Sequence, residues 1–306
     1  MKKRFLDYID HRGLITGILN GSRELGDTLQ RCGFWFIANI LMLRLGLFDK
    51  YVSIVGNETE ALEAVKTSEE GAAAVFIQMY NECLVDKAGW PIRHPDYAHS
   101  GKTSRDQMMS NLWALLYISK SSQYAKNELN RLWKLFLKDK LVLPANDILG
   151  PEHLTVFWRF FKQETNSFFM SGLYSILILL GDLHNILSTL YKNYYSKKVR
   201  HHSDDVNRIV MVLGPALVQP TILSNLSLYL YIKYRPAFVA STGEHYHGKP
   251  NNEYIQDKSK CGADQAMYHY CIGQEAPLDI LYKPVLLYLH DKSNTDPIKK
   301  FISYRI

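Results

Sequence analysis

The sequence predicts an all-α protein built from helical hairpins. Three observations predict it: apolar residues recur at helical spacing along nearly the whole chain, no segment alternates like a strand, and Gly- and Pro-containing loops separate the apolar segments. We therefore expect no β-strand and no β-hairpin. Repeated helix–loop–helix units favour an α/α-toroid-like barrel of paired helices, with an open helical bundle as the alternative.

The periodicity sets the order of the helices. They are expected over 32–47, 68–85, 107–119, 124–138, 151–162, 171–191, 204–218, 221–234 and 278–290. The first should end near Gly46, and the second carries Glu69 and Glu70 in its first turn, where the helix dipole favours acidic side chains. Pro215 and Pro220 are expected to end or kink the helices around them.

The 306 residues contain no Gly/Ser-rich or Pro-rich linker, which predicts a single helical domain over 1–306. The polar stretch 241–265 is the longest expected loop or lid. The most apolar stretch, 168–180, is interrupted by Ser171 and Ser175 and followed by Asp182. It falls short of the roughly 20 apolar residues that a bilayer-spanning helix needs, so we expect a buried helix and no membrane span.

Composition argues against several classes of protein. Charged residues interrupt the first ten positions, so no signal peptide is predicted and the expected location is cytoplasmic or virion-associated. The net charge is only +6, and the basic stretch 191–202 is typical of a solvated helix end, so nucleic acid is a disfavoured partner. No Walker loop, dinucleotide-binding glycine pattern or zinc-finger spacing occurs, so neither a cofactor nor a metal is predicted.

Two short polar clusters, 26–31 and 103–107, stand directly before long apolar helical segments. Asp27 with Gln30 fits an Asp variant of a capping box, and so does Ser104 with Gln107. In such a box the first side chain accepts from a backbone N–H of the first turn and the second reaches back to the cap. Capping would account for these four residues.

Capping does not account for Arg31, Arg105 and Asp106. An arginine in the first helical turn opposes the helix dipole, so it needs a local ion pair or a ligand. A guanidinium could bind a carboxylate, a phosphate or sugar hydroxyls. Two carboxylates that face each other can act as general acid and base in glycoside hydrolysis. Asp27, Asp106 and Asp205 are the catalytic candidates, although Asp205 also fits a first-turn acidic residue after a cap.

The loop before the second cluster is rich in ring and charged side chains. Trp90, His94, Asp96 and Tyr97 could provide a stacking face and hydrogen bonds for a sugar ring. A rigid loop that packs on the core needs similar residues, so both interpretations stay open. With Arg31 and Arg105, these four residues form the predicted substrate-binding set.

Several short motifs resemble a family of uncharacterised proteins from bacterial and bacteriophage genomes. They are Gly26-Asp27-Thr28-Leu29-Gln30-Arg31, Arg93-His94-Pro95, Ser104-Arg105-Asp106-Gln107, Asp204-Asp205-Val206-Asn207 and Ala276-Pro277-Leu278. The resemblance implies no particular activity and assigns no catalytic residue. The expected architecture is similar to α/α-toroid glycan enzymes, whose clefts lie at the N-terminal loops of their helices.

The leading functional hypothesis is therefore a glycan-acting hydrolase or lyase, with a carbohydrate as partner and its cleft at the helix N-terminal loops. The alternative is a non-enzymatic phage virion or cell-associated structural protein, in which the polar clusters serve as caps and ion pairs. The sequence leaves the oligomeric state open.

Overall fold

The computed structural model describes most of the first 190 residues and one later stretch. The described residues are 8–19, 22–46, 48–49, 52, 58–83, 89–97, 103–190 and 211–230. The expected lid over 241–265 and the expected helix over 278–290 lie outside them.

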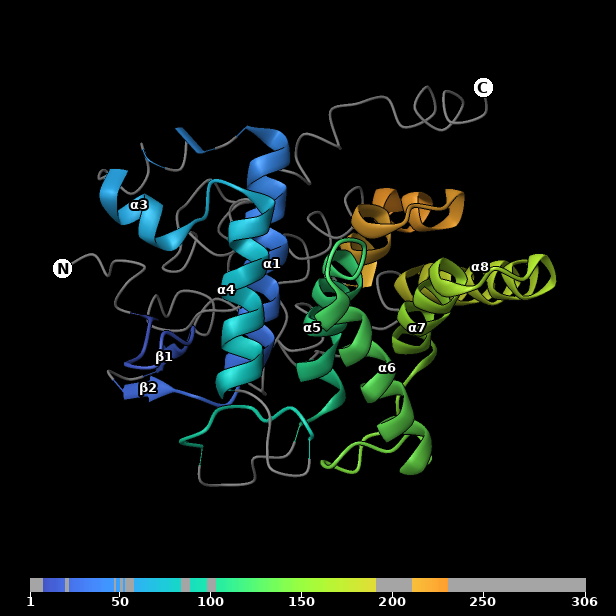
Figure 1. Ribbon diagram of the computed structural model, residues 1–306, viewed down its shortest axis with the longest axis horizontal. Helices are drawn as coiled ribbons and strands as arrows, with labels where there is room; N and C mark the ends of the chain where they lie inside the picture. The colour runs from blue at the N-terminus through green and yellow to red at the C-terminus, as the bar shows by residue number, and fades with distance from the viewer. Residues whose placement is uncertain are drawn as a thin grey trace.

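The described chain is mostly helical, which confirms the all-α prediction (Figure 1). The helices are α1 (Thr28–Leu45), α3 (Glu58–Ala64), α4 (Glu69–Gln78), the π-helical turn η2 (Met79–Cys83), α5 (Arg105–Ile118), α6 (Gln123–Lys138), α7 (Pro151–Glu164) and α8 (Phe168–Leu190). Residues 211–218 and 222–230 are also helical.

A small antiparallel sheet corrects the expectation that the chain forms no strand. Strand β1 (Gly17–Leu19) pairs with β2 (Ser22–Glu24) in the register Gly17↔Glu24, Ile18↔Arg23 and Leu19↔Ser22. The sequence between the strands is Asn20-Gly21, the dipeptide most typical of a two-residue hairpin. Each strand has only three residues, which is too short to show an alternating pattern.

The helix ends follow local chemistry only in part. The side chains of Ser68 and Ser122 accept backbone N–H groups at the starts of α4 and α6, and Gly46 ends α1 in the left-handed conformation at φ 61°. Asp27 and Ser104 do occupy the N-cap positions of α1 and α5. Neither side chain makes a capping hydrogen bond, so the capping-box prediction is wrong at both helices.

Helices α1 and α5 lie at the centre of the described structure and run parallel. Near their N-termini the Ser110 hydroxyl donates to the carbonyl of Gln30 (2.9 Å), and near their C-termini Arg44 Nη2 donates to the Tyr117 hydroxyl (2.7 Å). Gly33 allows the close approach, because a Cβ there would lie 2.6 Å from Ser110 Oγ. Both helices are buried around nearly their whole circumference, as helices of a core are.

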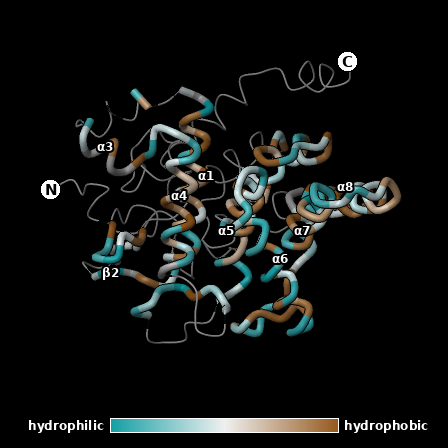
Figure 2. The backbone as a smooth tube through the Cα atoms, viewed as in Figure 1, coloured by the Kyte–Doolittle hydropathy of each residue, from teal (hydrophilic) through white to brown (hydrophobic). Residues whose placement is uncertain are grey.

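The other helices cover this pair. Figure 1 shows α4 alongside α1, with α6 and α7 beside α5 and α8 at the edge opposite the hairpin. Aromatic rings join α6 to α7, with the Trp133 and Phe157 rings 5.0 Å apart and the Phe136 and Phe157 rings 5.5 Å apart. Figure 2 shows apolar stretches in α1, α4 and α8.

Candidate functional site

The two polar clusters meet at the adjacent N-termini of α1 and α5. Gln107 Nε2 donates to Asp27 Oδ1 at 3.0 Å, across 80 positions of sequence. The other end of the same amide accepts from the backbone N–H of Gln30 at 3.3 Å. The Gln107 side chain thus links both helix N-termini, and only the folded chain brings Asp27 and Gln107 together.

Buried polar groups extend this contact inward. Asn111 Nδ2 donates to the carbonyl of Leu29 on α1 and to the carbonyl of Gln107 on its own helix, both at 2.8 Å. The carbonyl of Arg93 accepts from the backbone N–H of Leu29 at 3.1 Å, so the 89–97 loop supplies the partner for an N–H of the first turn of α1. Together with the hydrogen bonds of Ser110 and Arg44, these bonds hold the register of two helices whose remaining buried side chains are mostly apolar.

Arg31 is an almost buried part of this cluster. Its side chain is 8% exposed, and Nη2 lies 3.7 Å from Asp27 Oδ2. The guanidinium also packs against the backbone of β1, since a Cβ on Gly17 would lie within about 3.0 Å of three of its atoms. Arg31 therefore has a packing role and a local ion pair with Asp27, whose side chain is 26% exposed.

Arg105 and Asp106 lie at the start of α5, where α5 meets α7. Arg105 Nε is 3.9 Å from Asp106 Oδ1, and both side chains are partly exposed. The backbone N–H of Arg105 donates to Asp147 Oδ2 at 3.1 Å, so Asp147 satisfies the helix start in place of Ser104. His153 Nε2 of α7 donates to the carbonyl of Arg105 at 2.9 Å. The N-termini of α1, α5 and α7 thus form one edge; we name it the N-terminal edge.

Glu152 adds a carboxylate to the N-terminal edge that the sequence analysis missed. It lies in the first turn of α7, with Oε1 3.6 Å from His153 Nδ1 and Oε2 3.9 Å from His184 Nε2 of α8. Burial alone would raise its pKa, but His153, its own backbone N–H and Arg105 lower the pKa to about 2. The available sequence signal was an acidic residue directly after Pro151, a typical helix start.

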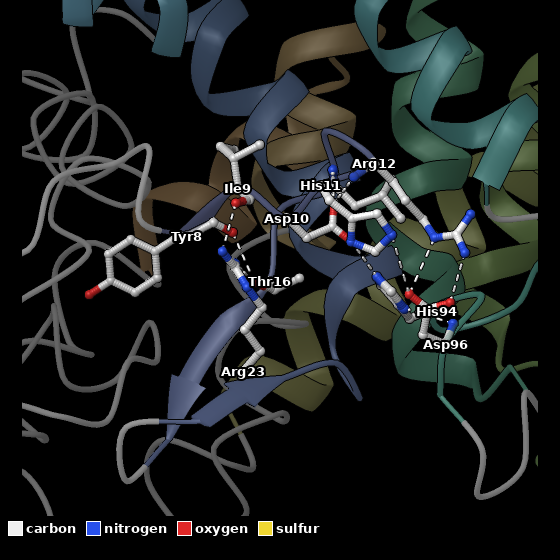
Figure 3. Close-up of polar contacts among 10 residues, drawn as sticks. Tyr8, Ile9, Asp10, His11, Arg12, Thr16, Arg23, His94 and Asp96 are labelled. Carbon is white, nitrogen blue, oxygen red and sulfur yellow. Dashed lines mark hydrogen bonds and ion pairs between the residues drawn. The ribbon is translucent and has the colours of Figure 1, made fainter.

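A separate group of polar side chains joins the segment that precedes the hairpin to the 89–97 loop; we call it the His94 cluster (Figure 3). His94 is 1% exposed, and its Nε2 lies 2.8 Å from Asp10 Oδ2. Its Nδ1 accepts from the backbone N–H of Asp96 at 2.9 Å, so the neutral ring carries its hydrogen on Nε2 and donates to Asp10. Asp10 Oδ1 accepts the backbone N–H groups of Arg12 and Leu14.

Nε2 of His94 therefore joins two segments 84 positions apart, whereas Nδ1 accepts a hydrogen bond within its own loop. Trp90 is also buried and packs on Phe136, with ring centroids 5.4 Å apart. These two members of the predicted substrate-binding set lie in the interior, where they anchor the loop. Tyr97 is half-buried, and its backbone N–H donates to the carbonyl of His94.

Asp96 lies at the surface of this cluster. Arg12 donates to both of its carboxylate oxygens, at 2.8 and 3.3 Å, and this contact is the main cause that lowers the pKa of Asp96. Asp10, His11 and Asp96 bring ligand atoms within 4.8 Å of one another, and they are the described residues that could hold a cation. Arg12 already pairs with the Asp96 carboxylate, and the His94 ring already donates to Asp10, so both carboxylates have partners within the protein.

A third polar feature is a fully buried ion pair between α7 and α8. Arg159 Nη2 donates to Asp182 Oδ1 at 2.9 Å and to Oδ2 at 2.8 Å, and both side chains are 0% exposed. The Thr221 hydroxyl donates to Oδ2 at 2.6 Å, and the guanidinium carbon lies 5.5 Å from the ring centroid of Trp113. The pair explains why a charged residue interrupts the apolar sequence of α8.

Helix α8 differs from the buried helix that the sequence predicted. Residues Phe168–Ser188 have a mean hydropathy of 1.3 and are long and apolar enough to cross a membrane. Only 28% of this apolar stretch is buried in the structure. Large apolar side chains, from Phe168 to Leu187, remain exposed along one face. The expectation of a buried helix is wrong for that face.

Asp205 lies outside the described residues, as does the basic stretch 191–202. No protein-family model, no curated protein and no solved structure matches the chain. The resemblance to the bacterial and bacteriophage family therefore stays a prediction from the sequence.

Proposed function

We propose that the protein is a glycan-acting hydrolase or lyase that uses the N-terminal edge of α1, α5 and α7. The observation that carries the proposal is the hydrogen bond between Gln107 Nε2 and Asp27 Oδ1, which unites the two polar clusters. Three helix N-termini beside one another also suit an α/α-toroid-like barrel, in which such ends surround a central cleft.

The chemistry of the edge supports this proposal. Asp27 and Asp106 are 26% and 28% exposed, so both carboxylates can meet a ligand as well as solvent. Paired carboxylates supply the acid and the base, or the acid and the nucleophile, of glycoside hydrolysis. Arg105 offers guanidinium donors to sugar hydroxyls or to an acidic sugar, and Glu152 stays ionised and can counter positive charge that develops on a sugar ring.

A glycan panel tests the proposal. Neutral, amino-sugar and uronic-acid polysaccharides are incubated with the full chain, and reducing ends and unsaturated products are measured. Asp27→Asn and Asp106→Asn should each lower turnover by about 100-fold or more, because each removes an acid–base group. Glu70→Gln is the matched control, since it removes an exposed carboxylate from the first turn of α4.

The control should keep full activity. Turnover that survives both aspartate substitutions, or the absence of product from every polysaccharide class, contradicts the proposal. Far-ultraviolet circular dichroism of each variant shows whether the fold is retained.

A specific observation also favours a second candidate, a non-enzymatic virion- or cell-associated structural protein. The face of α8 carries exposed Leu, Ile and Phe side chains of the kind that stable assemblies bury. Recovery of the protein in particles or cell-envelope fractions at a fixed stoichiometry would support this candidate. Recovery only as free protein would contradict it.

A further inference from the structure

The exposed face of α8 has a regular spacing. The side chains of Phe169, Leu173, Ile176, Leu180, Leu183 and Leu187 are between 40% and 76% exposed and follow one another at intervals of four and three residues. This is the spacing of a heptad repeat, in which two positions in every seven form the seam against a partner helix. We call these six side chains the α8 seam.

The opposite face of α8 is already used. Ile178, Asp182, Asn185 and Ile186 are buried toward the rest of the structure, and Asp182 holds Arg159 of α7. The helix is thus fixed on one side, and its seam points away from the described part of the chain. No Lys, Arg, Asp or Glu of α8 lies on the seam side, and the neighbouring His184 is directed to α7, with Nε2 3.9 Å from Glu152 Oε2, so the six seam side chains carry no charge to desolvate.

The α8 seam is complementary to itself. Its interval pattern reads the same in both directions, so an antiparallel second copy in register places Phe169 against Leu187, Leu173 against Leu183, and Ile176 against Leu180. Each layer then joins two seam side chains, which is how a seam packs knobs into holes. Antiparallel helices also oppose their dipoles, which favours this orientation over a parallel one.

The size of the seam matches what a dimer needs. With the exposed fractions above, the six side chains offer an apolar area on the order of 700 Å² per copy, close to the roughly 800 Å² that each partner contributes to a standard interface. A lipid surface would also accept apolar side chains, but it requires neither a seven-residue repeat nor a palindromic spacing.

We propose that two copies of this chain associate through α8, with the α8 seams packed antiparallel. The two-fold axis passes between the seams, midway along the helix between Ile176 and Leu180. The interface is isologous, since each copy presents the same surface to the other. The proposal is independent of the glycan activity, because the seam lies on α8 and the proposed active site lies at the N-terminal edge.

Light scattering after size exclusion tests the association with the full chain. The wild-type protein should have twice the chain mass of 35.3 kDa, and Leu180→Lys should raise the dissociation constant by about 100-fold or more, because each dimer then buries two ammonium groups. Leu137→Lys on α6 is the matched control: Leu137 is 53% exposed and Leu180 is 56% exposed, but Leu137 lies outside the seam. The control should stay dimeric.

Disulfide trapping tests the register. In a background without native cysteines, a tagged Ile176→Cys chain is mixed with an untagged Leu180→Cys chain and oxidised. The antiparallel register predicts the mixed disulfide, because residues 176 and 180 oppose each other across the axis. Disulfides only between identical chains would show a parallel pair and overturn the register.

Three results would overturn the association itself. One is a wild-type monomer up to about 0.1 mM that sediments with lipid vesicles, which would assign the seam to a bilayer. Another is a monomer that Leu180→Lys destabilises toward urea, which would mean that the seam is covered within its own chain. The third is a dimer that Leu180→Lys leaves intact, which would place the interface elsewhere.

Discussion

Replacing Asp182 by Asn should strongly destabilise the protein, although the side chain keeps its shape. The carboxylate accepts two hydrogen bonds from Arg159 Nη2 and a third from the Thr221 hydroxyl, and no part of the pair reaches solvent. The substitution leaves a buried guanidinium without a counter-charge. Burial already lowers the pKa of Arg159, and Asp182 is the group that opposes this effect.

The expected loss is about 3–5 kcal/mol in the free energy of unfolding, the usual cost of removing one partner from a buried ion pair. That is a large fraction of the roughly 5–15 kcal/mol that stabilises an ordinary domain. Urea denaturation followed by circular dichroism measures the loss. The double variant Arg159→Met/Asp182→Leu should lose less than the sum of the losses of Arg159→Met and Asp182→Leu by about 2 kcal/mol or more, because no charge is left buried.

Glu164→Gln is a matched control, since Glu164 Oε1 and Lys126 Nζ are also 2.8 Å apart but lie at the surface. This exposed pair should cost no more than about 1 kcal/mol. A loss from Asp182→Asn as small as that from Glu164→Gln, or a double variant that loses the full sum of the single losses, would show that Asp182 does not stabilise a buried charge.

Two further predictions concern the N-terminal edge and the helix contact. The pKa of Glu152 is lowered from 4.5 to about 2, so its contribution to stability, on the order of 3 kcal/mol, is complete above pH 4.5 and is lost as the pH falls toward 2. Glu152→Gln should therefore make the midpoint of urea denaturation depend less on pH over this range. The same pH dependence in the variant and the wild type would contradict the lowered pKa. Gly33→Ala should lower the free energy of unfolding by about 1–3 kcal/mol, because its Cβ would lie 2.6 Å from Ser110 Oγ. Gly172→Ala, whose Cβ would have nothing within 4 Å, should be neutral or stabilising. Equal effects of the two substitutions would show that α1 and α5 can move apart freely.

The helices themselves could be predicted from periodicity, because each buries a face whose apolar residues recur every three or four positions. The end of α1 at Gly46 followed from the same local chemistry. The hairpin at β1 and β2 was missed although Asn20-Gly21 stands between the strands. Three-residue strands carry no periodic signal, so only the turn dipeptide could have predicted them.

The polar side chains show the limit of local reasoning more clearly. Gln107 has the sequence position of a capping residue, yet its amide binds Asp27 and the backbone of Gln30 on another helix. His94 has the sequence context of a surface binding residue, yet it is buried against Asp10. Each partner comes from about 80 positions away, and no local pattern encodes such a choice.

The sequence by itself determined that the chain is helical, where most of the described helices lie, and that polar side chains gather at the starts of α1 and α5. These are properties of a helix and its first turn, so neighbouring residues decide them. Only the tertiary structure decided that those starts meet, that α7 adds Glu152 beside them, and that the other described helices leave one face of α8 exposed. Hydrogen bonds and burial between distant segments depend on how the helices pack, and the same local sequence permits several packings.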